Sequence, residues 1–259
     1  MIVQNLVTPN GPCQRLLVVH RTGSGKTTSM ISILENFIDD KERAKVMFFP
    51  TKNIKVNFME TMFERSLYSD RFKKDKEDTR DKKNVDCFEE YCKTKLNLHT
   101  FALQQFGTTY LGAAPFSNKS KNLDCKPGIN HFKNMVVVLD EVHNIYDKEY
   151  INELREDVVI NFKRMITCLY NCKSAVVVGF TATPAVQTKD GRLNYNVLKN
   201  FIKGKMNKNK LDDGFISVLY PSLENPNSRY PISKEIRAIF PKINIKRKYI
   251  RLQGVIDKK

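Results

Sequence analysis

Long apolar segments are missing from this 259-residue chain, and their absence excludes whole classes of protein. No apolar run approaches the ~20 residues that a membrane-spanning helix needs. The N-terminal segment MIVQNLVTPNGPCQ also lacks the basic start, the apolar stretch and the small-residue cleavage site of a signal peptide. We therefore expect a soluble, intracellular protein with no membrane partner, placed in the cytoplasm, with the nucleus left open.

Cysteine is scarce as well. Six cysteines are too few for a disulfide scaffold in a chain of this length, and their spacings differ from those of a zinc ribbon. We interpret them as reduced thiols. Cys168 and Cys172 are one helical turn apart, and we interpret them as small apolar residues of a helix face rather than as metal ligands.

Acidic residues are outnumbered by basic ones. The chain has 28 Asp and Glu against 44 Lys and Arg, which gives a formal net charge of +16. Residues 186–259 hold 17 Lys and Arg against 6 Asp and Glu, so this stretch carries +11 of that charge. Such an excess favours an anionic partner, and nucleic acid or a nucleotide is the usual candidate.

Short Val-rich runs predict the fold class. The runs cover Leu16–Val19, Val46–Phe49, Leu96–Phe101, Met135–Leu139 and Ala175–Gly179. Apolar runs of about five residues without alternation are typical of strands buried on both faces of a parallel sheet. After the first run, apolar residues recur at helical spacing, which predicts a unit of strand, loop, helix and strand. We expect further helices over 54–67 and 150–170. The chain is therefore predicted to be α/β.

The segment HRTGSGKTT, residues 20–28, follows the first apolar run and precedes the first amphipathic helix. In this context a glycine-rich loop turns backbone N–H groups toward a phosphate, and the helix N-terminus adds its positive dipole end. Lys26 would reach the β- and γ-phosphates, and the Thr27 hydroxyl would join the coordination shell of Mg²⁺. We predict a nucleotide-binding loop formed by Thr22, Gly23, Ser24, Gly25, Lys26, Thr27 and Thr28.

Two further motifs follow predicted strands. In VVVLDEVHN, Asp140 would hold Mg²⁺ and Glu141 would orient and deprotonate an attacking water, which makes Glu141 and Lys26 the catalytic candidates. In VVVGFTATPA, small hydroxyl residues reach the carboxyl edge of the same sheet, where ligands gather in open α/β folds.

The ordered set of HRTGSGKT, DEVH and TATP resembles motifs I, II and III of DExH-type superfamily 2 helicases, which lie in the first of two RecA-like domains. The sequence is also similar to helicase-like ATPases of nucleocytoplasmic large DNA viruses. That group contains the poxvirus early transcription factor large subunit and nucleoside triphosphate phosphohydrolase I. Its members show a segment like NPxTPYxGLLxxHGxGxGKT, to which VTPNGPCQRLLVVHRTGSGKT is similar, with Arg21 in place of the usual Gly.

The resemblance implies a domain organisation and further site residues. Residues 1–185 would form a RecA-like P-loop domain with a charged insertion at about 69–86. Residues 186–259 would form a basic, irregular connector toward a second RecA-like domain. The segment FFPTKNIKVNF resembles motif Ia, so Thr51 and Lys52 are implied to contact nucleic acid. The residues implied to couple nucleotide state to nucleic-acid binding are His143, Thr181, Ala182 and Thr183.

The resemblance thus implies an ATP-binding domain of a nucleic-acid-dependent ATPase or helicase that uses ATP and Mg²⁺. It favours DNA over RNA and a role in viral-type transcription, with the transcription machinery as a partner and a viral factory or virion as a location. No counterpart of motifs IV, V or VI is evident, so we expect a second RecA-like domain or a partner subunit to complete the site. Three alternatives stay open. The chain could be a truncated module that binds ATP and nucleic acid without hydrolysis, a P-loop transferase, or an inert scaffold whose basic tail binds nucleic acid.

Overall fold

The computed structural model describes residues 5–11, 14–20, 23–76, 84–106, 115–116, 131–172, 174–183, 186–187, 193–194 and 214–219. The chain divides into two compact units, residues 1–221 and 222–259, and every described residue lies in the first. The predictions for Thr22, for residues 77–83 of the charged segment and for most of 186–259 lie outside the described residues.

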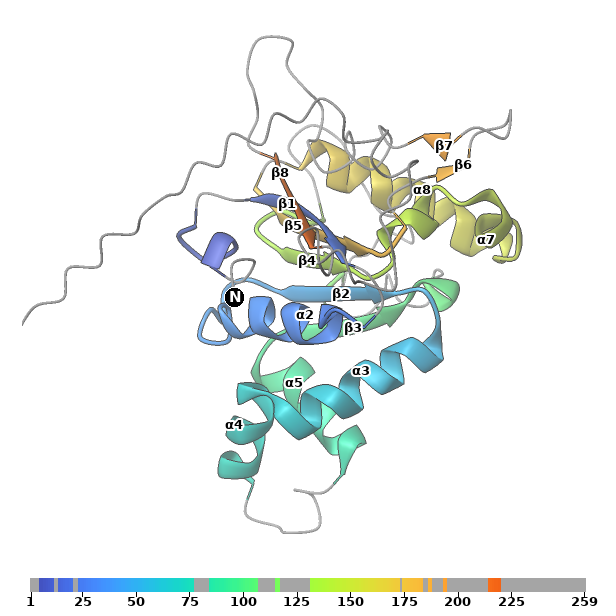
Figure 1. Ribbon diagram of the computed structural model, residues 1–259. Helices are drawn as coiled ribbons and strands as arrows, with labels where there is room; N and C mark the ends of the chain where they lie inside the picture. The colour runs from blue at the N-terminus through green and yellow to red at the C-terminus, as the bar shows by residue number, and fades with distance from the viewer. Residues whose placement is uncertain are drawn as a thin grey trace, which may run out of the picture. The chain divides into compact units, whose positions relative to one another are not determined.

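A six-stranded parallel sheet forms the centre of the described structure (Figure 1). Its strands are β1 (Arg15–His20), β2 (Lys45–Phe49), β3 (Leu98–Ala102), β4 (Val136–Leu139), β5 (Val176–Thr181) and β8 (Gly214–Leu219). They lie in the order β3-β2-β4-β5-β1-β8, and all neighbouring pairs are parallel. The five apolar runs of the sequence are the first five of these strands, so the predicted α/β fold class with a parallel sheet flanked by helices is confirmed.

Both faces of the sheet are covered, and the sequence of β1 shows how. Leu16 and Val18 contribute to one hydrophobic cluster, whereas Leu17 and Val19 contribute to another on the opposite face. Successive side chains of a strand point to opposite faces, so the central positions of a strand covered on both sides are all apolar. This requirement explains why these runs show no alternation.

Helices build the two layers around the sheet (Figure 1). The first cluster packs under α2 (Lys26–Glu35), α3 (Lys52–Arg65), α4 (Leu67–Asp75) and α5 (Val85–Lys95). The second packs under the short turns η2 (Leu103–Gln105) and η3 (Val142–Ile145), helix α7 (Lys148–Asn152) and helix α8 (Glu156–Asn171). A separate antiparallel pair joins β6 (Val186–Gln187) to β7 (Leu193–Asn194).

Three elements differ from the sequence-based expectations. The single helix expected over 150–170 is two helices, because α7 ends at Asn152 and α8 starts anew at Glu156. Helix α4 runs into the charged segment as far as Asp75, since Tyr68 and Phe72 are fully buried one turn apart, and this narrows the insertion predicted at 69–86. Strand β8 lies within the stretch expected to be an irregular connector and corrects that expectation for residues 214–219.

The cysteines also require one correction. Cys168 and Cys172 are buried on α8 and in its C-terminal cap, as expected for apolar residues of a helix face. Cys168, however, is disulfide-bonded, whereas Cys87, Cys92 and Cys172 are free, so the interpretation of all six as reduced thiols is wrong for Cys168. No helix within the described ranges combines the length and the apolar character needed to cross a membrane.

Two buried cations hold helix C-termini to the sheet. Arg15 of β1 donates hydrogen bonds to the backbone oxygens of Leu169 and of Cys172, the latter at 2.7 Å, at the end of α8. Lys45 of β2 donates to the backbone oxygen of Asp40 at 2.6 Å, just beyond the end of α2. Because the last carbonyls of a helix lack intrahelical partners, each cation satisfies groups that burial would otherwise leave unpaired.

Candidate nucleotide and nucleic-acid site

The loop between β1 and α2 has the backbone geometry of a phosphate-binding loop. Gly23 and Gly25 both have φ of +81°, and Gly25 is the N-cap of α2. A Cβ atom added at either position would meet no heavy atom within 4 Å, so the left-handed backbone, rather than lack of space, calls for glycine here. Lys26, Thr27 and Thr28 then form the first turn of α2, where N–H groups lack intrahelical partners and favour an anion.

The acidic pair lies at the carboxyl end of β4. Asp140 is buried, and its Oδ1 accepts the backbone N–H of Glu141 at 2.9 Å. Glu141 is the N-cap of η3 and has φ of +45° and ψ of +53°. A non-glycine residue in this left-handed region is strained by roughly 1–3 kcal/mol, and such strain clusters at functional sites. This strained backbone places the Glu141 carboxylate in contact with Lys26 and His143.

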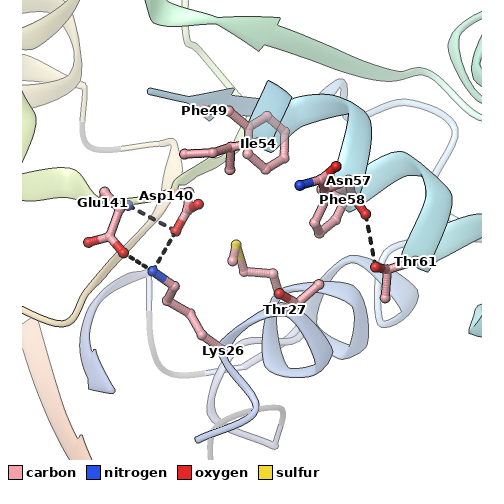
Figure 2. Close-up of a pocket in the computed structure, with 10 residues that line it drawn as sticks. Lys26, Thr27, Phe49, Ile54, Asn57, Phe58, Thr61, Asp140 and Glu141 are labelled. Carbon is pink, nitrogen blue, oxygen red and sulfur yellow. Dashed lines mark hydrogen bonds and ion pairs between the residues drawn. The ribbon is translucent and has the colours of Figure 1, made fainter. Parts of the chain in front are cut away.

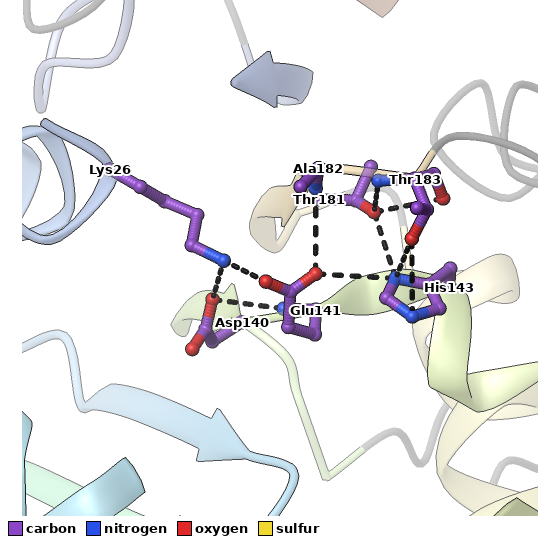
Figure 3. Close-up of polar contacts among 7 residues, drawn as sticks. All are labelled: Lys26, Asp140, Glu141, His143, Thr181, Ala182 and Thr183. Carbon is purple, nitrogen blue, oxygen red and sulfur yellow. Dashed lines mark hydrogen bonds and ion pairs between the residues drawn. The ribbon is translucent and has the colours of Figure 1, made fainter. Parts of the chain in front are cut away.

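Lys26 links the loop to the acidic pair (Figure 3). Its Nζ lies 3.1 Å from Asp140 Oδ1 and donates a hydrogen bond to Glu141 Oε1. Burial lowers the pKa of Lys26, but the two carboxylates outweigh burial and raise it above its ordinary value. Burial likewise raises the pKa of Asp140, against the opposing charge of Lys26. The predicted residues of motifs I and II are therefore in direct contact.

Glu141 is held in its ionised form. Burial alone would raise the pKa of this carboxyl, but hydrogen bonds from His143 and Lys26 outweigh it and lower the pKa to about 2. His143 Nδ1 lies 3.3 Å from Glu141 Oε2, and the same oxygen accepts the backbone N–H of Ala182 at 3.4 Å. The carboxylate thus contacts groups from the ends of β4 and β5 and from α2.

The residues after β5 form one network with His143 (Figure 3). Thr181 Oγ1 lies 2.8 Å from His143 Nδ1, and Thr183 Oγ1 lies 3.2 Å from the same nitrogen. Thr181 Oγ1 donates to the backbone oxygen of Thr183 and accepts its backbone N–H, both at 3.0 Å. The Thr181 hydroxyl proton is donated to the backbone oxygen of Thr183, so Thr181 Oγ1 must accept a hydrogen bond from His143. This favours the His143 tautomer that carries its proton on Nδ1.

His20, the last residue of β1, is buried beside this site. Its ring meets the ring of Phe180 edge to face, with centroids 6.3 Å apart. Burial lowers the pKa of His20, and the charge of Lys26 lowers it further, so the imidazole is neutral near pH 7. His20 thus places an uncharged ring against Phe180 of β5.

A cavity of about 290 Å³ opens next to Lys26 and the acidic pair (Figure 2). It is lined by Lys26, Thr27, Met30, Phe49, Ile54, Asn57, Phe58, Thr61, Asp140 and Glu141. The acidic pair and the Lys26 ammonium lie on one side of the cavity, and Asn57 and Thr61 of α3 lie in the wall across the cavity from them (Figure 2). The sequence analysis missed this wall, although the helical spacing of Ile54, Phe58 and Thr61 along one face of α3 would have indicated it.

Thr51 and Lys52 lie at the end of β2, away from the Lys26 network. Thr51 is the N-cap of α3, and its Oγ1 accepts the backbone N–H of Ile54 at 3.3 Å. Lys52 is exposed in the first turn. This arrangement presents a helix N-terminus and a free-standing cation at the same sheet edge as the nucleotide-site residues, which suits a phosphate group.

Several known proteins are similar to this chain in sequence or structure. A mimivirus protein (Acanthamoeba polyphaga mimivirus) with the provisional name ATP-dependent RNA helicase R563 is 28% identical over 154 residues, which are 59% of this chain and 25% of that protein. The helicase domain of Pyrococcus furiosus Hef is 16% identical, with a TM-score of 0.44 over 90% of this chain and 38% of that one. Mss116p bound to single-stranded RNA and AMP-PNP is 15% identical, with a TM-score of 0.48 over 84% of this chain and 39% of that one.

The chain thus spans only a quarter of the length of its mimivirus relative and well under half of these two solved chains. Residues 5–186, more than half of the chain, match the family described as type III restriction enzyme, res subunit, and this range includes the glycine-rich loop, the acidic pair and Thr181–Thr183. The chain belongs to this ResIII family of helicase-type ATPase domains.

Proposed function

We propose that this chain is the ATP-hydrolysing domain of a nucleic-acid-dependent helicase of superfamily 2. The observation that carries the proposal is the continuous network from Lys26 through Glu141 to His143 and Thr181. A loop that binds phosphate, a carboxylate that activates water and a sensor of the γ-phosphate must meet at one point for hydrolysis to drive a conformational change. These side chains come from β1–α2, β4 and β5, and they meet at one edge of the sheet.

ATP would shift the partners of Lys26. The ammonium group would move from the carboxylates to the β- and γ-phosphates, which leaves the carboxylate of Glu141 to accept a proton from the attacking water. Its pKa of about 2 depends on Lys26 and His143, so the loss of the Lys26 contact raises the basicity of Glu141 as substrate binds. The catalytic base would therefore be activated by the same movement that binds the phosphates.

Mg²⁺ fits the oxygen ligands at this site. Mg²⁺ is usually held by one or two carboxylates together with substrate phosphates, and it neutralises charge on the transferred group. Thr27 and Asp140 both line the cavity and would hold it. Because two protein oxygen ligands leave most of the octahedral shell to phosphates and water, we expect Mg²⁺ to bind together with the nucleotide.

The coupling and nucleic-acid contacts complete the proposal. His143, Thr181, Ala182 and Thr183 would pass the loss of the γ-phosphate to the rest of the domain. His143 and Ala182 contact Glu141 directly, and Thr181 and Thr183 contact His143. Thr51 and Lys52 would contact a nucleic-acid phosphate. We propose DNA as the nucleic acid and viral-type transcription as the process, on the resemblance to the viral ATPases. The mimivirus relative is called an RNA helicase, so RNA is tested in parallel.

The test is phosphate release from ATP by the chain and by Glu141→Gln, with and without single-stranded DNA and RNA. We expect release that rises with nucleic acid and falls by about 10²-fold or more in Glu141→Gln, because removal of a general base costs 10²–10⁴-fold. Glu64→Gln, at an exposed position on α3, is the matched control and should leave the rate unchanged. Phosphate release that persists in Glu141→Gln would refute the assignment of the base.

Two other outcomes of this experiment would distinguish the alternative functions. Nucleotide binding that needs Lys26 but yields no phosphate would show that the chain holds ATP and requires a second RecA-like domain or a partner subunit for hydrolysis. Transfer of the γ-phosphate to an acceptor, instead of its release, would identify a P-loop transferase.

A further inference from the structure

Tyr150 joins the nucleotide site to the start of α3 across the sheet edge. Its hydroxyl donates a hydrogen bond to the backbone oxygen of Pro50 at 2.7 Å, and the two residues are 100 positions apart in the chain. Tyr150 is half-buried against the cluster that contains Val142 and Ile145. Its backbone is also fixed, because Asp147 Oδ1 accepts the N–H groups of Glu149 and Tyr150 at 2.9 and 3.4 Å.

The acceptor of this bond is the peptide group in front of α3. The oxygen of Pro50 belongs to the same peptide plane as the N–H of Thr51, and Thr51 is the N-cap of α3. A hydrogen bond to a peptide oxygen polarises that peptide and strengthens its N–H as a donor. Tyr150 therefore both orients and polarises the backbone at the point where the helix N-terminus would receive a phosphate.

The other end of the connection is the acidic pair. Helix α7, which carries Tyr150, follows η3 after two residues and packs against it. The strained backbone of Glu141 starts η3, and His143 within η3 contacts Thr181 and Thr183. A continuous segment of ten residues, 141–150, therefore connects Glu141 and His143 to the Tyr150 hydroxyl.

We propose that Tyr150 is a positioning residue that transmits nucleotide state from Glu141 and His143 to a nucleic-acid phosphate at Thr51. This inference rests on the proposed function, since it assumes that both ligands bind. It names a connection separate from the contacts of Thr181–Thr183. A purely structural role would only satisfy a buried hydroxyl, and it predicts lower stability with no effect on the linkage between the two ligands.

The experiment measures the affinity of a fluorescent single-stranded oligonucleotide with and without a non-hydrolysable ATP analogue. The ratio of the two dissociation constants is the linkage. Tyr150→Phe keeps the ring and removes only the hydroxyl, and we expect it to reduce the linkage by about threefold to tenfold, the factor that corresponds to one hydrogen bond.

Tyr68→Phe is the matched control. The Tyr68 hydroxyl donates to the backbone oxygen of Leu34 at 3.0 Å, so this variant removes the same kind of bond in the other helix layer. It should leave the linkage at the wild-type value. A second measurement needs neither ligand. The amide proton resonance of Thr51 should move upfield in Tyr150→Phe and stay in place in Tyr68→Phe.

The outcomes separate the two proposals. Wild-type protein that binds neither ligand, or binds both without linkage, overturns the proposed function and leaves Tyr150 nothing to transmit. Wild-type linkage that persists unchanged in Tyr150→Phe overturns the role of Tyr150 alone. Equal loss of linkage in Tyr150→Phe and Tyr68→Phe overturns it as well, because the effect would then follow from general destabilisation.

Discussion

At the scale of single residues, Lys26 neutralises the two carboxylates that a divalent cation would otherwise bind. Its Nζ lies 3.1 Å from Asp140 Oδ1 and also contacts Glu141. Lys26→Ala removes this competing charge, so we expect the variant to bind Mn²⁺ without nucleotide at least about tenfold more tightly than wild type, a difference of ~1.4 kcal/mol.

Titration of each protein with Mn²⁺, followed by the electron paramagnetic resonance of the free ion, measures this change. Lys52→Ala removes an exposed cation of α3 and should bind Mn²⁺ as wild type does. The double variant Lys26→Ala with Asp140→Asn should lose the gain. Equal Mn²⁺ affinity in wild type and Lys26→Ala would show that Lys26 does not screen the acidic pair.

Lys45 gives a pH-dependent contribution to stability at the same scale. Burial lowers the pKa of this fully buried side chain to about 8, against the opposing charge of Asp40. An unfolded lysine has a pKa near 10.4, so between these values the unfolded chain binds the extra proton. Stability rises with pH wherever the unfolded state binds more protons, so the contribution of Lys45 increases between about pH 8 and pH 10.

We expect the unfolding free energy of wild type to gain about 2 kcal/mol relative to Lys45→Met over that range. Urea unfolding of both proteins at pH 8 and pH 10 measures it. The variant serves as the reference because it shares every other titrating group. A constant difference between the two proteins would mean that Lys45 titrates at its ordinary value.

At the scale of elements, Arg15 anchors the end of α8 to β1. Its guanidinium binds the backbone oxygens of Leu169 and Cys172, both buried at the C-terminus of the helix. Arg15→Met keeps an apolar stem of similar length but leaves these carbonyls without the donor. We expect a loss of about 1–3 kcal/mol in unfolding free energy, the cost of leaving buried acceptors unsatisfied.

Chemical unfolding monitored by circular dichroism tests this value. Arg65→Met is the control, because the Arg65 side chain is exposed and its pair with Glu64 is 3.7 Å long, so the change should be small. A loss in Arg15→Met no larger than in Arg65→Met would show that solvent or other groups satisfy the carbonyls.

The sequence predicts elements well where one local pattern decides them. The central positions of strands β1, β2, β4 and β5 are uninterrupted apolar runs, because a sheet covered on both faces favours apolar side chains on both sides of each strand. The end of α7 at Asn152 has no such signal, since neither glycine nor proline stands there. Strand β8 was missed because its pairing with β1 is a contact between distant segments, which no local pattern reveals.

The site shows the same division. The glycines, Lys26, Asp140 and Glu141 are set by short motifs, and the structure brings the last three into contact. The wall formed by α3 and the Tyr150 bond depends on which helices face each other across the sheet edge. The sequence around Tyr150 predicts an ordinary core residue, so its place beside the site emerges only from the fold.

At the scale of the whole molecule, the residues of the nucleotide site and much of the positive charge lie in different parts of the chain. Lys26, Thr27 and Asp140 lie in the unit of residues 1–221. Residues 222–259 contain 10 Lys and Arg against 3 Asp and Glu, a net +7 of the total of +16. Binding of ATP should therefore depend on the first unit, whereas the strength of sequence-independent nucleic-acid binding should depend on both.

A chain ending at residue 221 tests this division. Each phosphate contact on a single strand contributes about 0.7 to the slope of log affinity against log salt concentration, because bound cations release counterions. We expect the shorter chain to show a smaller slope and weaker binding to single-stranded DNA and RNA alike, with the affinity for an ATP analogue unchanged. Titrations of both chains between low and physiological salt give the slopes. An unchanged slope would place the phosphate contacts in the first unit, at Lys52 and the N-terminus of α3, and would make the basic C-terminal unit dispensable for binding.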